Sequence, residues 1–146
     1  MTKQPALLKI MTIDFAAFLG WLLPVVFSGM YIFLLILGRI KTSDFTFTLI
    51  YAAVSVIALG VLLWRIQLIR GVFSDGIETT ATINSISFFR DRGRVEYIYM
   101  HEGKKYAGGN AVHKVKQTEA LQVGQQVVVV IDRNQPKRAF IRDLYL

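Results

Sequence analysis

Residues 15–37 read FAAFLGWLLPVVFSGMYIFLLIL, a stretch of 23 residues that contains no charged side chain. As an α-helix, at about 1.5 Å per residue, this stretch would measure roughly 35 Å, which is enough to cross a hydrocarbon layer of about 30 Å. A second uncharged run, Phe45–Trp64, follows after the short link Gly38–Asp44. Because the link is short, the two helices must be antiparallel. The sequence therefore predicts a membrane α-hairpin of two transmembrane helices in residues 1–70.

The basic residues that flank the two apolar runs predict the orientation of the hairpin. The link carries Arg39 and Lys41, whereas four basic residues lie at the end that holds both termini: Lys3, Lys9, Arg65 and Arg70. Lys and Arg are enriched in cytoplasmic segments, so this distribution favours a cytoplasmic location for both termini and for the region that follows. The first run is longer than the apolar core of a secretory signal, which has about 7–15 residues, so we expect a retained anchor.

Small residues are spaced along both predicted helices. They are Gly20 and Gly29 around Pro24 in the first helix, and Ala52, Ala53, Ser55, Ala58 and Gly60 in the second. Small side chains let helices approach closely in a bilayer, and a proline is expected to kink its helix. Two interpretations stay open, because these faces can pack the two helices on each other or receive a helix of another membrane protein. A transport pathway is disfavoured because neither run carries a charge at mid-depth.

Asp14 stands directly before the first apolar run. The side chain of Thr12 or of Asp14 can accept a hydrogen bond from a free N–H group at the helix start, and a carboxylate suits the positive end of the helix dipole. A proton relay or ion site is the alternative role for this carboxylate. Its position at the edge of the run favours capping.

From Ile77 onward, apolar and polar residues alternate, which is typical of β-strands. The alternation slips by one residue near Asn84–Ser85, so we expect a β-bulge there. The first strand begins at Ile77, and the later predicted strands are Val95–Met100, Lys104–Gly108, Gln126–Ile131 and Arg138–Leu144. Between them, Ala111–Val123 shows no alternation, which predicts a loop with one or two helical turns. We therefore expect residues 71–146 to form a small all-β barrel, OB-like because of this element order, with an SH3-like barrel as the alternative.

In several segments of this region, the spacing between turn glycines and apolar strand residues is similar to that in a known family. They are Gly76 with Thr80–Ile83, Val95–Tyr99, Gly103–Tyr106, Gly124–Val129, and Asp132 with Pro136 and Ala139. The pattern resembles a bacterial family of uncharacterised small membrane proteins that pair transmembrane helices with a compact β domain. Its members often have Val-Tyr-Tyr-Asp-Pro before the final turn, whereas this chain has Ile131-Asp132-Arg133.

The layout is also similar to NfeD-like membrane proteins, whose soluble part is an OB-type barrel and which act as accessories to membrane scaffold proteins or proteases. What the two resemblances imply is an accessory or binding role in a bacterial cytoplasmic membrane. They supply no catalytic residues.

Composition and motifs argue against an enzyme. The 146 residues carry a net charge of +7 and contain no cysteine, which excludes a disulfide, a thiolate nucleophile and a cysteine-bound metal. The signatures of serine hydrolases, zinc proteases and phosphate-binding loops are missing. The two histidines, His101 and His113, lie on separate predicted turns. We therefore expect no catalytic residues, no metal and no cofactor.

The turn Arg90–Arg94 is the most distinctive basic cluster. Its three arginines, at alternate positions, could bind lipid phosphates or an acidic partner, as could Arg65 and Arg70 near the helix ends. The candidate contacts are thus Arg65, Arg70, Arg90, Arg92 and Arg94. The plainer interpretation is that the arginines keep a hairpin tip soluble.

Nucleic acid is a third option, since bases could stack on aromatic residues of the same strands. These residues are Phe88, Phe89, Tyr97, Tyr99 and Tyr106. Aromatic residues at period two are usually core or cross-strand pairs, and membrane tethering further disfavours nucleic acid.

Three hypotheses of function follow. The preferred one is a non-enzymatic, membrane-anchored accessory or adaptor protein that binds other membrane-protein subunits or copies of itself. The second is a module that binds anionic lipid or another polyanion at the membrane surface. The third is a membrane hydrolase or a small transporter, which would need a polar cluster assembled from distant segments.

Overall fold

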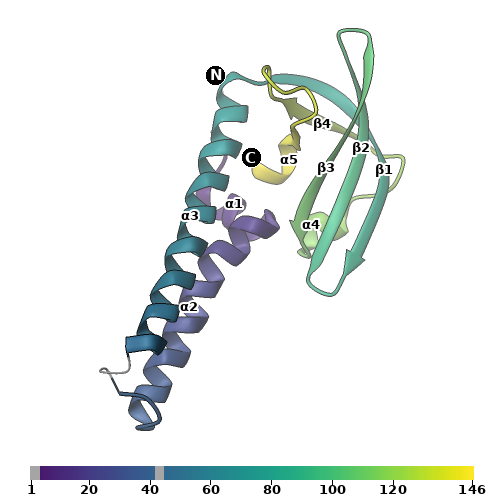
Figure 1. Ribbon diagram of the computed structural model, residues 1–146. Coiled ribbons are helices and arrows are strands. Elements are labelled where there is room, and N and C mark those ends of the chain that lie inside the picture. The colour runs from purple at the N-terminus through teal and green to yellow at the C-terminus, as the bar shows by residue number, and fades with distance from the viewer. Residues whose placement is uncertain (1–3, 42–44) are drawn as a thin grey trace.

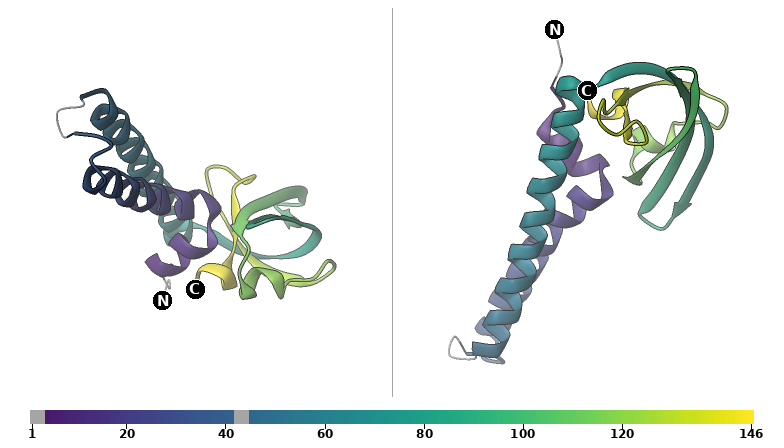
Figure 2. Two further views of the ribbon diagram at one scale, coloured as in Figure 1. Left: turned by 90° about the horizontal axis from the view of Figure 1, so that it is seen from below. Right: turned by 45° about the horizontal axis from the view of Figure 1, so that its top comes forward.

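The computed structural model describes residues 4–41 and 45–146, so Lys3 and the end of the predicted link lie outside the described residues. Two long helices run side by side and carry a curved sheet at one end (Figure 1). Figure 2 shows from two further sides that the sheet lies beside the helix pair and not along its whole length. The predicted pair of apolar helices and the predicted β domain are both present.

The two long helices are α2, Phe15–Ile36, and α3, Phe45–Asp75. Both are long and apolar enough to cross a membrane, and only 6% and 17% of the residues in their most apolar windows are buried. A helix that is apolar all round and belongs to the core of a soluble protein would be mostly buried. The exposed apolar surface of this pair is therefore suited to a bilayer.

The second long helix continues past the point where the sequence predicts its end. The sequence places the hairpin in residues 1–70, whereas α3 runs on to Asp75. Val72 and Phe73 in these last turns are 5% and 7% exposed. Burial of apolar surface against the sheet thus outweighs the low helix propensity of Gly71.

A short helix, α1, covers Leu7–Ile13 and was not predicted as a separate element. Its residues Ile10 and Ile13 are buried. Asp14 separates α1 from α2 because its backbone is extended, with φ −73° and ψ 118°. The Asp14 carboxylate accepts a hydrogen bond of 3.0 Å from the Ala17 N–H group. The predicted capping role of Asp14 is confirmed.

The sheet has five antiparallel strands in the order β3-β2-β1-β4-β5. They are β1 Ile77–Phe89, β2 Arg92–His101, β3 Lys104–His113, β4 Gln126–Ile131 and β5 Ala139–Ile141, with the one-turn helix α4, Lys116–Glu119, between β3 and β4. The register slips between Ile83 and Ser85, which confirms the predicted bulge. The fourth strand has the predicted bounds.

Several strand ends differ from the predictions. β2 runs from Arg92 to His101 instead of from Val95 to Met100, and β5 begins at Ala139 instead of Arg138. β3 does not stop near Gly108 but pairs with β2 as far as Arg92 opposite His113. Gly108 is needed inside the strand, because a Cβ there would lie 2.7 Å from the Tyr97 ring. The last strand does not reach Leu144. It ends at Ile141, where the chain turns into α5, Arg142–Tyr145.

A side chain nearly closes the sheet into a barrel. Asn110 of β3 donates a hydrogen bond of 2.9 Å to the Ala139 carbonyl of β5 and accepts one of 3.3 Å from the Ile141 N–H group. The Tyr97 hydroxyl lies 2.6 Å from the same Ala139 carbonyl oxygen. Burial raises the pKa of Tyr97, since an ionised phenol is disfavoured in this apolar seam. These contacts join β2 and β3 to β5 where no backbone ladder does.

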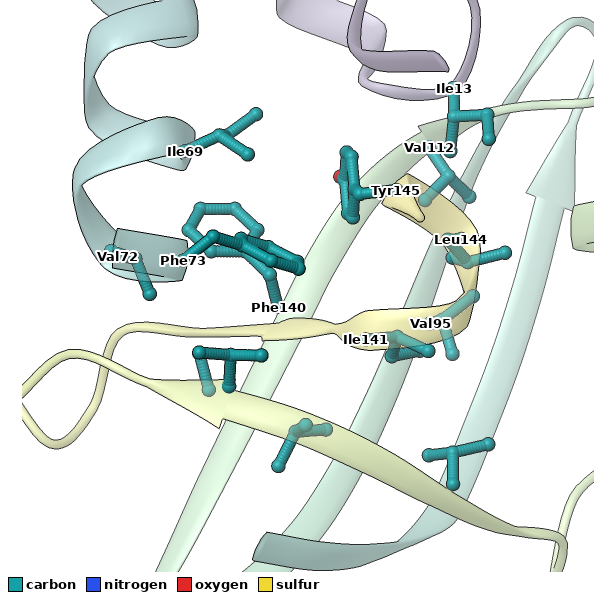
Figure 3. Packing of buried hydrophobic residues seen from close by; sticks show 14 of the residues in the cluster. Ile13, Ile69, Val72, Phe73, Val95, Val112, Phe140, Ile141, Leu144 and Tyr145 are labelled. Atoms are coloured by element: carbon teal, nitrogen blue, oxygen red, sulfur yellow. The ribbon is translucent and has the colours of Figure 1, made fainter. Parts of the chain in front are cut away.

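One apolar core joins the barrel to the helices (Figure 3). Tyr145 lies between α3 and the barrel, with its ring centroid 6.0 Å from that of Phe73 and 5.8 Å from that of Phe140. Ile13 of α1 belongs to the same cluster. The Ala6 N–H group donates a hydrogen bond of 3.2 Å to the Tyr145 carbonyl. The barrel is thus seated on one end of the hairpin in a defined orientation.

Candidate functional site

The end of β3 packs on the start of the first apolar helix. Val112 forms a β-bridge with Asp14, the residue that caps α2. The His113 ring stacks on Phe18 at a centroid distance of 4.0 Å and an angle of 12°. His113 Nδ1 also lies 3.2 Å from the Thr12 carbonyl oxygen. This end of the barrel therefore lies at the boundary of the apolar span.

The strand register brings the arginine-rich turn to the same boundary. Arg92 pairs with His113 across β2 and β3, and Phe89 pairs with Arg92 across β1 and β2. The tip of the β1–β2 hairpin is thus only two residues, Arg90 and Asp91. In Figure 1 this tip is the lower end of the barrel, and it points in the direction in which α2 descends. We call residues 89–94 the arginine turn.

The exposed end of the arginine turn combines an aromatic ring with two cations. The Phe89 side chain is 64% exposed. The guanidinium carbon of Arg90 lies 5.4 Å from the centroid of the Phe89 ring, and that of Arg92 lies 5.9 Å from it. Arg94 instead pairs with Glu96 at 2.8 Å and, with a hydrogen bond from Ser85, lowers the pKa of Glu96. Within the described part of the chain, Arg90 and Arg92 form no ion pair with a carboxylate.

A groove of about 370 Å³ separates the arginine turn from the start of α2. Its walls are Phe15, the first residue of α2, together with Ser87, Phe88, Phe89, Arg92, Gly93, Arg94 and Ala111. A Cβ at Gly93 would lie 2.4 Å from the Phe88 ring, so a larger residue there would force this ring to move. The groove therefore has aromatic walls and a basic rim, and it adjoins the apolar span.

The turn at the opposite end of the same strands has a different chemistry. The β2–β3 turn consists of Glu102 and Gly103, both with a left-handed backbone, at φ 49° and 72°. Figure 1 shows this turn at the upper end of the barrel. The arginine turn also has a left-handed residue, but there it is Arg90, at φ 54°. The two turns thus differ in their tip residues, which are Glu102 and Gly103 in one and Arg90 and Asp91 in the other.

The other predicted contacts lie elsewhere, and Arg65 has a partner within the chain. Its Nε and Nη2 atoms donate hydrogen bonds of 3.0 and 2.5 Å to the two oxygens of Asp14. Asp14 is fully buried, and the Arg65 side chain is 18% exposed. Its guanidinium also lies 5.6 Å from the Phe140 ring centroid. Arg70 is half-buried on α3, with an Nε atom that has no hydrogen-bond partner among the described residues.

The small residues proposed for helix packing fall into two groups. Gly20 lies at the contact of α2 with α3, since a Cβ there would be 2.8 Å from the Leu62 Cβ and 3.0 Å from the Ala58 carbonyl oxygen. A Cβ at Gly29 or Gly60 would meet nothing within 4 Å. Of the remaining residues, Pro24 is half-buried inside α2, Ser55 is half-buried on α3 with no partner for its hydroxyl among the described residues, and Ala52 is exposed.

A second groove, of about 290 Å³, lies between α3 and the β4–β5 loop. Three basic residues line it, but Arg65 is bound to Asp14 and Arg138 is bound to Asp132 at 3.1 Å. Of these three basic residues, only Lys137 forms no ion pair with a described residue. The groove beside the arginine turn is therefore the stronger candidate site for an anion.

The sequence contained a signal for the Asp14–Arg65 pair that was not used. Asp14 directly precedes the first apolar run and Arg65 directly follows the second, so an antiparallel hairpin places both at the same level. By contrast, the stacking of His113 on Phe18 and the contribution of Phe15 to the groove depend on how the barrel docks. His101 and His113 lie near opposite ends of β2 and β3, and no group of three or more potential metal ligands is found among residues 4–41 and 45–146.

Comparisons of this chain with family models, with characterised proteins and with solved structures find no match in any of the three. The resemblances drawn from spacing therefore stay predictions. The assignment of a function has to be built from the geometry described above.

Proposed function

We propose that this protein is a non-enzymatic adaptor anchored in a membrane, which holds a small barrel at the membrane surface for assembly with other membrane-protein subunits or with copies of itself. The observation that supports this most is the core shared by the barrel and the hairpin. Ile13, Ile69 and Tyr145 come from three different helices and belong to one cluster with strand residues. Because the hairpin and the barrel share one core, the hairpin fixes the orientation of the barrel relative to the bilayer.

The finer assignments belong to the same proposal. The strand order, with a helix between β3 and β4 and with β5 beside β3, favours an OB-like barrel over an SH3-like one. An accessory role like that of NfeD-like proteins agrees with this layout. We place the protein in a bacterial cytoplasmic membrane, with the barrel on the cytoplasmic side, on the strength of the flanking Lys and Arg residues.

The exposed faces of the long helices are the proposed partner surface. Gly29 and Gly60 leave open space, and Ala52 is exposed on α3. Within a bilayer, small residues allow the close backbone contacts that drive helix association. A partner helix seated there would lie on a side of the hairpin that the α2–α3 contact does not use.

The test is photocrosslinking in intact membranes, with a photoreactive residue at Ala52, followed by purification in mild detergent. We expect one stoichiometric second polypeptide, and we expect Gly60→Leu to abolish its recovery. The matched control is Leu49→Ile, which changes an exposed residue of the same helix without changing its volume. A second copy of the chain at this position would identify self-association as the form of the contact. Recovery of the bare monomer from every variant would contradict the adaptor role.

A further inference from the structure

We infer that the arginine turn and the groove beside it bind an anionic phospholipid of the bilayer that holds the hairpin. In this arrangement Phe89 enters the interfacial layer, and Arg90 and Arg92 bind the lipid phosphate. The inference rests on the proposed anchoring of the hairpin in a membrane but not on the adaptor role, since it concerns a different surface and a different ligand.

The first argument is position. Asp14 and Arg65 mark the end of both uncharged runs, and Val112 and His113 pack directly on the residues around Asp14. The arginine turn is paired in register with this end of β3. Phe15, the first residue of the span, forms one wall of the groove. A lipid at the rim of the hairpin therefore meets the arginine turn without any movement of the barrel.

The second argument is chemical complementarity. A phospholipid offers a phosphate above an apolar glycerol and acyl region. The arginine turn offers two guanidinium groups without an ion-pair partner in the described chain, both within 6 Å of the centroid of an exposed phenyl ring. Guanidinium groups bind phosphate through two parallel hydrogen bonds, and exposed phenylalanine side chains insert at the boundary of headgroups and acyl chains. The lining of the groove continues this pattern, because it includes Phe88 together with Arg92 and Arg94.

The third argument is the backbone of Arg90. Its φ of 54° is left-handed, a conformation that glycine or asparagine adopts at less cost. The β2–β3 turn has the same feature, since Glu102 there has a φ of 49°. The left-handed conformation thus belongs to both two-residue turns. What distinguishes the arginine turn is that a cation takes this position at the end of the barrel that packs on the start of α2.

A soluble polyanion is the competing ligand, and the position of the groove disfavours it. One wall of the groove is the first residue of an apolar span, so a nucleic acid or an acidic peptide would have to enter the interfacial layer to fill it. A lipid is already there.

The first experiment measures the depth of the turn with the full chain, which contains no cysteine and can be labelled at single introduced sites. Phe89→Cys carries a nitroxide at the arginine turn, and Glu102→Cys carries the matched nitroxide at the opposite turn. In nanodiscs of phosphatidylcholine and phosphatidylglycerol, we expect the label at position 89 to relax faster with oxygen than with a water-soluble nickel complex. The label at position 102 should show the reverse. Equal access of the nickel complex to both labels would overturn the inference.

The second experiment measures which lipid stays bound after mild extraction from the same nanodiscs, by native mass spectrometry. Arg90→Glu with Arg92→Glu should lower the retained phosphatidylglycerol at least about tenfold relative to the wild type, since each basic residue near an anionic surface contributes to the attraction. Lys104→Glu with Lys105→Glu makes the same change in net charge at the other end of the barrel and should leave retention within about twofold. An equal loss in both variants would overturn the inference, because net charge alone would explain it.

Two further arms separate the remaining explanations. Arg90→Gly removes a charge and relaxes the left-handed backbone, so a loss of lipid in this variant cannot be assigned to unfolding; unchanged retention would count against a role of Arg90. Inorganic phosphate in excess should not displace the lipid, and displacement would assign the site to a free anion. Binding of an oligonucleotide that the arginine variants abolish while lipid retention stays unchanged would assign it to a soluble polyanion and overturn the inference.

Discussion

Arg65 donates two hydrogen bonds to Asp14, of 3.0 and 2.5 Å, and so ties the end of one apolar run to the start of the other. The carboxylate is fully buried, and it also caps α2. An ion pair in this setting joins the hairpin to the barrel, because Asp14 bridges to Val112 and Arg65 lies against Phe140. Four predictions test this and related features of the structure.

Removal of one partner of the buried pair should destabilise the protein strongly. We expect Asp14→Ala to lower the free energy of unfolding by about 3–5 kcal/mol, because Arg65 would stay buried without a counter-charge. The double variant Asp14→Asn with Arg65→Met keeps a capping side chain and removes both charges. It should lose much less stability than the sum of its two single variants. Equilibrium unfolding in mixed detergent micelles measures all of them, and strictly additive losses would show that the two residues are not coupled.

The seam between β3 and β5 depends on one amide side chain. Asn110→Ala should cost about 2–3 kcal/mol, since the Ala139 carbonyl loses its amide donor and the Ile141 N–H group loses its acceptor. Hydrogen exchange of the Ile141 amide should accelerate in the same variant. Asn84→Ala, at an exposed position of β1, is the control and should change stability by no more than about 0.5 kcal/mol. Unchanged exchange at Ile141 would mean that another group closes the barrel.

The same substitution should have opposite effects at two glycines of α2. Gly20→Ala places a Cβ 2.8 Å from the Leu62 Cβ and 3.0 Å from a backbone oxygen, so it should destabilise the hairpin by about 1–3 kcal/mol. Gly29→Ala meets no atom within 4 Å and should be neutral or stabilise the helix by up to about 1 kcal/mol. Thermal unfolding in detergent, followed by circular dichroism, compares the two. Equal effects would place the helix contact elsewhere.

The buried tyrosines predict a loss of stability at alkaline pH. Burial raises the pKa of Tyr97, Tyr99 and Tyr145 above the ordinary value of about 10. Above pH 10 the unfolded chain therefore binds fewer protons than the folded one, so the free energy of unfolding should fall as the pH rises. This contribution to stability is complete below pH 10. Tyr97→Phe should reduce the slope between pH 10 and 11, and an unchanged slope would show that Tyr97 does not contribute.

The sequence predicted those features of the fold that depend on local patterns. Uncharged length predicted α2 and α3, the continuous apolar run Val127–Ile131 predicted β4, and the slipped phase predicted the bulge at Ile83–Ser85. Local patterns did not predict the ends of helices and strands that depend on tertiary contacts. Phe73 is helical because the barrel covers it, and the chain leaves the β conformation after Ile141 because Tyr145 fills the space beside α3.

The candidate site could be predicted only in part for the same reason. The three arginines of the turn are visible in the sequence, and so are Arg65 and Arg70. The sequence could not show which of these arginines have a partner within the chain. Arg65 binds Asp14 and Arg94 binds Glu96. Arg90 and Arg92 instead lie near the Phe89 ring. These pairings depend on contacts between residues up to 51 positions apart.

The hydrogen bond from Ala6 to Tyr145 has a consequence for biogenesis. A ribosome makes α1 before the strands and α5 after them, so the partner of α1 is missing while the strands are being made. The two long helices can enter the bilayer during this time, but α1 can take its final place only after α5 has left the ribosome. Docking of α1 on α5 is therefore a late step in the folding of this chain.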